Sequence, residues 1–155
     1  MNTPLRPIDR EGIFKVRPRE WWVRKADSNA VAVSFDFDIL EQHNGTDWDS
    51  WAEYEQHTVF GDYWVVKKDG TINTAVVEQL AASIGWDGNL SAVQDTPPNV
   101  VAQITVKAET YEGKTRFKAG WMNPENFTPG PAGAAPEEVN QLQSQFGSLL
   151  RAAAA

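Results

Sequence analysis

Four basic side chains lie close together between residues 106 and 121, in a chain whose formal net charge is -7: Lys107, Lys114, Arg116 and Lys118. Tyr111 lies among them. Basic side chains neutralise phosphates, and a flat ring beside them offers a stacking surface for an unpaired base. The segment therefore has the side-chain types that single-stranded nucleic acid requires. The alternative is an ordinary solvated hairpin face, with Glu109 and Arg116 as a surface ion pair.

The dipeptide Glu112-Gly113 predicts a two-residue hairpin turn between two strands. This turn sets Lys107 directly opposite Lys118, a like-charge pair that an anion between them would stabilise. Because side chains alternate along a strand, the same register divides the hairpin into two faces. The apolar face is expected to hold Ile104, Val106, Ala108, Phe117, Ala119 and Trp121, with Ile104 opposite Trp121, and the charged face Lys107, Glu109, Tyr111, Lys114, Arg116 and Lys118.

Two pairs of adjacent aromatic residues, Trp21-Trp22 and Tyr63-Trp64, fall in predicted strands. Neighbouring strand residues point to opposite faces, so each pair sends one ring outward. That ring is either covered by a terminal segment or serves as a stacking platform, and the sequence leaves open which ring of each pair it is. The predicted nucleic-acid site therefore joins phosphate-binding and stacking residues: Lys107, Lys114, Arg116, Lys118, Arg24 and Lys25, with Tyr111, Trp21, Trp22, Tyr63 and Trp64.

The elements that must position these residues follow from hydrophobic periodicity. Strands are predicted over 20–26, 30–40 and 51–68, an amphipathic helix over 73–85, and two further strands over 99–122. This order predicts a mainly β fold, a five-stranded OB-fold barrel with one helix between the third and fourth strands. A C-terminal amphipathic helix is expected in addition.

The predicted organisation has four parts: a basic N-terminal arm at 1–18, the OB-fold domain at 19–124, a Pro/Gly/Ala linker at 125–136 and a C-terminal helical tail at 137–155. The tail carries an apolar stripe at helical spacing. That stripe is expected to pack on its own barrel, on another copy in a homo-oligomer, or on a replication or recombination protein. It consists of Val139, Leu142, Phe146, Leu149 and Leu150.

Composition excludes several function classes. The absence of cysteine rules out disulfides and thiolate metal sites, and no apolar run is long enough to cross a bilayer. We therefore expect a soluble cytoplasmic protein without a membrane partner. No nucleophile-elbow, phosphate-loop or dinucleotide motif occurs. His43 and His57 lack metal-site spacing, and Asp36 with Asp38 indicates a charged solvent-facing strand. The chain is thus predicted to be no enzyme and to use no cofactor or metal.

Acidic residues dominate one block of the chain. Between residues 26 and 62 there are nine acidic side chains and neither Lys nor Arg. A ligand responds to local potential rather than to net charge, so a polyanion can still bind another face. We hypothesise that this block repels duplex DNA or imitates nucleic acid toward a protein partner.

Two runs, GTINTAVVEQLAASIGWDGNL and VVAQITVKAETYEGKTRFKAGWMNPEN, resemble a family of phage-encoded proteins. That family, long known as a domain of unknown function, is encoded near recombination and replication genes and is regarded as OB-fold single-stranded DNA-binding proteins. The resemblance covers residues 70–127. It implies a non-enzymatic protein that coats single-stranded DNA with little sequence preference, in the cytoplasm of an infected host cell. Many such proteins end in an acidic tail, whereas this sequence ends in SLLRAAAA.

Two other functions stay open from the sequence. Exposed aromatic rings also stack on sugars, so an oligosaccharide-binding module is one alternative. A structural or adaptor protein that assembles through its C-terminal helix is the other.

Overall fold

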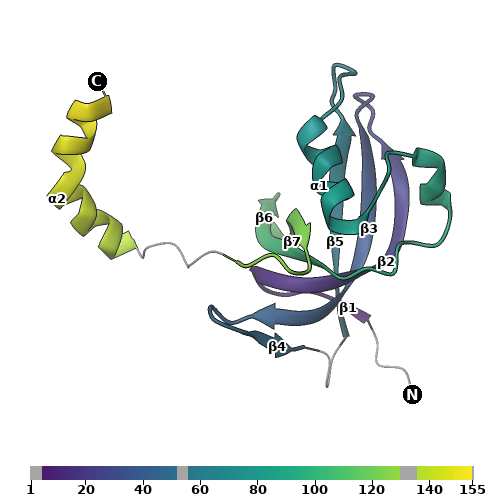
Figure 1. The fold of residues 1–155 in the computed structure, drawn as a ribbon, viewed down its shortest axis with the longest axis horizontal. Helices are drawn as coiled ribbons and strands as arrows, with labels where there is room; N and C mark the ends of the chain where they lie inside the picture. The colour runs from purple at the N-terminus through teal and green to yellow at the C-terminus, as the bar shows by residue number, and fades with distance from the viewer. Residues whose placement is uncertain (1–4, 52–55, 130–135, 155) are drawn as a thin grey trace.

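The computed structural model describes residues 5–51, 56–129 and 136–154, and most of them lie in strands (Figure 1). One seven-stranded sheet is accompanied by two α-helices and a short 3-10 helix, η1. The strands are β1 (Leu5–Pro7), β2 (Gly12–Lys25), β3 (Val31–His43), β4 (Trp48–Ser50), β5 (Gln56–Val66), β6 (Ala102–Tyr111) and β7 (Lys114–Pro124). The helices are α1 (Thr74–Ile84), η1 (Leu90–Gln94) and α2 (Pro136–Ala154).

The sheet curls into a partial ring. Its strand order is β1-β5-β7-β6-β2-β3-β4, and β3 also pairs with β5, so that the ring runs β2-β3-β5-β7-β6 and returns to β2. β5 and β7 pair in parallel at a single register position, Phe60 with Lys118, while the other ring pairs are antiparallel. The prediction of a mostly β fold with one helix between the third and fourth ring strands and another at the C-terminal end is confirmed.

The segment predicted as a surface arm is partly built into the sheet. β1 extends the sheet beside β5, and β2 begins at Gly12 and continues through Pro18. The strand tolerates this proline because its pairing with β3 is irregular between Pro18 and Glu20. Phe14 and Val16 are fully buried. Apolar alternation before the proline was thus the signal that the prediction overlooked.

The core fills the inside of the ring and is closed by α1. Aromatic residues of β2 and β3, Phe14, Phe35 and Phe37, are wholly buried, as is Leu80 of α1. The helix ends as predicted at Gly85, whose φ of 74° is the left-handed conformation that glycine adopts readily. Gln79 fastens the helix to β7, since its side-chain oxygen accepts a hydrogen bond from the Met122 amide.

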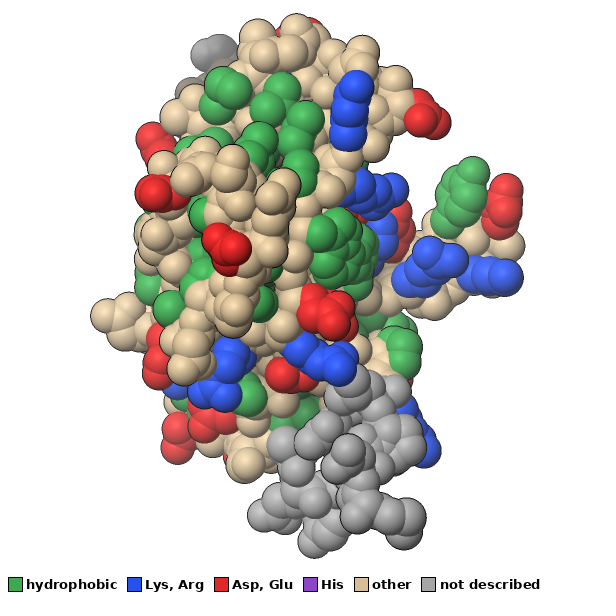
Figure 2. All heavy atoms as spheres, turned by 90° about the vertical axis from the view of Figure 1, so that its right-hand side faces the viewer, with side chains coloured by type: hydrophobic (Ala, Val, Ile, Leu, Met, Phe, Trp, Pro, Cys, Tyr) green, Lys and Arg blue, Asp and Glu red, His purple; other side chains and the backbone are tan. Residues whose placement is uncertain are grey.

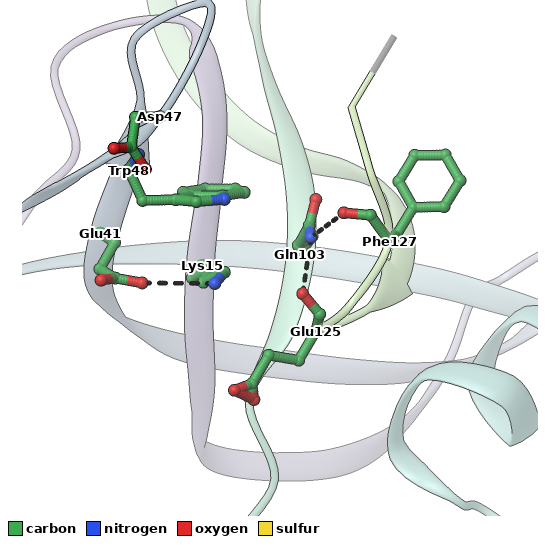
Figure 3. A network of polar contacts seen from close by, with 7 residues as sticks. All are labelled: Lys15, Glu41, Asp47, Trp48, Gln103, Glu125 and Phe127. Atoms are coloured by element: carbon green, nitrogen blue, oxygen red, sulfur yellow. Dashed lines mark hydrogen bonds and ion pairs between the residues drawn. The ribbon is translucent and has the colours of Figure 1, made fainter.

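Two groups of polar contacts, one around Gln103 and one around Lys15, secure segments outside the ring (Figure 3). The Gln103 amide nitrogen on β6 donates to the carbonyl oxygens of Glu125 at 2.7 Å and Phe127 at 2.5 Å, which ties the chain leaving β7 to the sheet. On the β2 side, Lys15 lies 3.6 Å from Glu41 and 4.6 Å from the ring centre of Trp48. The chain that leaves β7 and the β4 hairpin are therefore held by non-covalent contacts.

The predicted linker lies partly outside the described residues, which resume at 136 with α2. Across the ranges that the structure describes, no helix combines the length and the apolar character needed to span a bilayer.

Candidate nucleic-acid interface

The β6–β7 hairpin has the predicted register at its tip. Glu112 and Gly113 both have positive φ, 51° and 76°, as a two-residue turn with the twist of the flanking strands requires. Lys107 pairs with Lys118 and Tyr111 with Lys114. The basic side chains and the tyrosine therefore share one face of the hairpin, as predicted.

Nearer the core the predicted register is wrong. Ile104 pairs with Met122 and not with Trp121, because β7 contains an extra residue where the pairing shifts between Ile104 and Val106. Met122 consequently faces the core, while Trp121 is 53 % exposed instead of lying on the apolar face. The irregularity is held in place by the Tyr63 hydroxyl, which donates to the Gly120 carbonyl at 2.8 Å.

The cations of the hairpin differ in their partners. Lys118 lies 3.4 Å from Glu109, so the ion pair of this face involves Lys118 rather than Arg116. Within the described residues, Lys107, Lys114 and Arg116 form no ion pair. Three positive charges on this face therefore have no carboxylate partner among the residues that the structure describes.

Each adjacent aromatic pair does send one ring outward, as predicted. Trp21 and Tyr63 are the inward members: Trp21 packs on the core and donates to the Asp95 carbonyl at 2.8 Å, and Tyr63 is only 4 % exposed. Burial raises the pKa of the Tyr63 hydroxyl far above its ordinary value. Trp22, 37 % exposed, and the half-buried Trp64 are the outward rings.

Small residues on β3 allow side chains of β2 and β5 to meet. Ala32 and Ser34 are completely covered, because larger side chains from both neighbouring strands close over them. Trp22 stacks on Phe60 with ring centres 5.8 Å apart and planes inclined by 29°. A ring of β2 and a ring of β5 therefore meet over the intervening strand β3.

Arg24 links the same two strands beside these rings. Its guanidinium donates to the Asp62 carboxylate at 2.7 Å and lies 5.8 Å from the ring centre of Trp64. Ser34 also donates to Asp62, at 2.5 Å. The Asp62 carboxylate is thus paired with a positive charge, and Arg24 is fixed next to the half-buried ring of Trp64. Lys25 is exposed but follows Arg24 directly, so it points to the opposite face of β2.

A groove of about 730 Å³ runs between Phe60 of β5 and the hairpin. Phe60 and Phe117 supply apolar walls, and Arg24, Arg116 and Lys118 supply positive charge. A second hollow of about 350 Å³ lies on the charged face of the hairpin and shares Arg116 and Lys118 with the groove. On the face shown in Figure 2, basic side chains lie directly beside hydrophobic ones.

The groove also contains a carboxylate, Asp36, 3.6 Å from Arg19. Partial burial raises the pKa of Asp36, with smaller contributions of the same sign from Glu20 and Asp38, while Arg19 acts in the opposite direction. An anionic ligand would therefore meet one unfavourable charge among the cations.

Phe60 is a site residue that the sequence prediction missed. It alternates with Asp62 and Trp64 along β5, so the outward position of Trp64 implies that Phe60 faces outward too. Trp64 additionally lines an apolar hollow of about 480 Å³ beside Lys67 and Lys68.

The described ranges contain no group of three or more His, Asp or Glu side chains placed to hold a metal ion. The two histidines are engaged separately: His57 accepts a hydrogen bond from the Trp51 indole at 2.9 Å, and His43 lies against the ring of Trp48. The described side chains at this site are mainly aromatic rings and cations.

Comparison of the sequence with protein-family models and with curated proteins finds no match, so the resemblance to the phage family stays a prediction.

Proposed function

We propose that this chain is a non-enzymatic single-stranded DNA-binding protein that holds the strand in the groove between the rings of β2 and β5 and the β6–β7 hairpin. One observation carries the proposal: Phe60, on which Trp22 stacks, lines the same groove as Arg116 and Lys118. Arg24 lines this groove as well and lies against the ring of Trp64. Rings and cations are both needed to hold an unpaired strand without reading its sequence.

The arrangement of the ring strands supports an OB fold. Five strands follow one another around the ring, and α1 connects the third of them, β5, to the fourth, β6. OB folds bind oligonucleotides on the face of their second and third strands, together with the loops after the first and fourth strands. In this chain those elements are β3, β5, the 26–30 turn and the hairpin tip, which border the hollows described above.

Base stacking favours single strands over duplexes. In a duplex the base faces are occupied by neighbouring bases, whereas an unpaired base can lie on Trp22, Phe60 or Trp64, with a gain of about 1 to 3 kcal/mol for each base. The basic side chains then contact phosphates, and the contacts weaken as salt increases. A role in phage replication or recombination rests on the resemblance of residues 70–127.

The proposal is tested by fluorescence anisotropy with a labelled oligo-dT strand and a duplex of equal length, at low and moderate salt. We expect binding of the single strand, weaker binding of the duplex and a loss of affinity with salt. Phe60→Ala should weaken single-strand binding about 5- to 150-fold, as the loss of one stacked base implies. Leu90→Ala, a matched change at an exposed apolar residue of η1, should leave it unchanged. Salt-insensitive binding of a neutral oligosaccharide, without DNA binding, would instead support the carbohydrate alternative.

A further inference from the structure

The C-terminal helix presents an apolar stripe that no described element covers extensively. α2 is drawn apart from the sheet in Figure 1, and Leu149 and Leu150 are 70 % and 65 % exposed. Val139, Leu142 and Phe146 are also exposed. A contiguous exposed stripe of this kind is typical of an interaction surface.

The spacing of the stripe is that of a two-helix seam. Apolar residues recur at alternating steps of three and four positions, which is the a and d pattern of a coiled coil. They are Val139, Leu142, Phe146, Leu149 and Ala153. The stripe therefore fits a second helix of the same pitch, whereas a curved sheet would not need this regular alternation.

Charges at the two ends of α2 distinguish between orientations. Glu137 and Glu138 lie in the first turn and Arg151 in the last turn. Two parallel copies would place acid beside acid and arginine beside arginine. Two antiparallel copies place the acidic turn of each helix opposite Arg151 of the other, and their helix dipoles also oppose each other favourably.

We propose that α2 is a self-association element in which two copies of this chain pair through antiparallel helices. The matching register places Leu142 against Phe146 of the second copy, and Val139 against Leu149. Leu150 lies beside Leu149 at the edge of the stripe, where the small side chain of Val139 of the second copy leaves space for it. Each contact occurs twice, as in any twofold interface. This inference does not depend on the proposed DNA-binding function.

The test uses the full chain, with mass measured by analytical ultracentrifugation over a range of concentrations. We expect a concentration-dependent dimer that Phe146→Glu converts to a monomer, while Gln141→Glu, on the other side of the helix, leaves it intact. Arg151→Glu should weaken association about tenfold, because the charge pairing is lost at both ends. Adding Glu137→Arg and Glu138→Arg to that variant should restore it. Circular dichroism of each variant reports whether α2 itself persists.

Cysteine cross-linking tests the orientation, and the native chain contains no cysteine that would interfere. Near the twofold axis of the antiparallel pair, residue 145 of one copy lies beside residue 145 of the other, so Gln145→Cys should form a disulfide-linked dimer. Residue 153 of the two copies would be about 27 Å apart, so Ala153→Cys should not cross-link. A monomer at all concentrations, an assembly larger than two chains, or cross-linking at 153 in preference to 145 would overturn the proposal.

Discussion

Replacement of Arg116 by glutamine should lower both the affinity for single-stranded DNA and its dependence on salt. Arg116 lines the groove and the hollow on the charged face of the hairpin, and it forms no ion pair within the described residues. It is therefore available for a phosphate. Each phosphate contact contributes about 0.7 to the slope of log affinity against log salt for single strands, so the slope should become shallower by about that amount.

The neighbouring carboxylate provides a control with the opposite sign. Glu109 lies opposite Arg116 across the hairpin and 3.4 Å from Lys118. Glu109→Gln releases Lys118 and removes a negative charge, so affinity should increase. The increase should be no more than about fivefold, because exposed ion pairs are worth less than about 1 kcal/mol.

Anisotropy titrations of labelled oligo-dT across a salt series measure both effects, and thermal unfolding checks that the hairpin variants keep their stability. An unchanged salt slope for Arg116→Gln would refute the assignment of this residue to phosphate. A loss of affinity in both variants would exclude an electrostatic contribution of this hairpin face to DNA binding, because the two changes alter the charge in opposite directions.

Three further predictions concern the ring, the groove and the stacking surface. Gly61→Ala should destabilise the fold by about 1 to 3 kcal/mol in denaturant unfolding, because its new methyl would lie 2.8 Å from the Ala119 methyl, and adding Ala119→Gly should recover part of the loss. Burial raises the pKa of Asp36, so its contribution to the free energy of unfolding is fully present below the ordinary aspartate pKa and is lost as pH rises through the raised value. Asp36→Asn should abolish this loss and strengthen DNA binding at neutral pH. An unchanged dependence of stability on pH would contradict this prediction. Trp64→Ala should weaken oligo-dT binding about 5- to 150-fold, whereas Trp64→Phe should retain most of it, and equal losses in both would exclude stacking.

The hairpin was predictable because its signals are local. The Glu112-Gly113 turn and the alternation of Lys107, Glu109 and Tyr111 specify the same register, and the structure has that register as far as Val106 with Ala119. Beyond this point the prediction failed at Trp121. The extra residue in β7 depends on the contact between Tyr63 and Gly120, 57 positions apart, which no local pattern reveals.

The groove was predictable only in part. Alternation places Trp22 on the opposite face of its strand from Trp21, and Trp64 on the opposite face of its strand from Tyr63. It does not say which face of either strand is buried. Side chains of β2 and β5 meet over β3 because the β3 residues beneath them, Ala32 and Ser34, are small. This contact depends on the order of the strands in the sheet, which no single segment of the sequence reveals. Phe60 became a candidate only once that order was known.

Quenching of tryptophan fluorescence by poly-dT reports whether Trp22, Phe60 and Trp64 form a surface for unpaired bases. We expect strong quenching by the single strand and little by an equal length of duplex. Quenching should be clearly reduced in the Trp22→Phe and Trp64→Phe variants but not in Trp86→Phe, whose indole is buried. Absence of quenching by poly-dT at low salt would contradict this expectation.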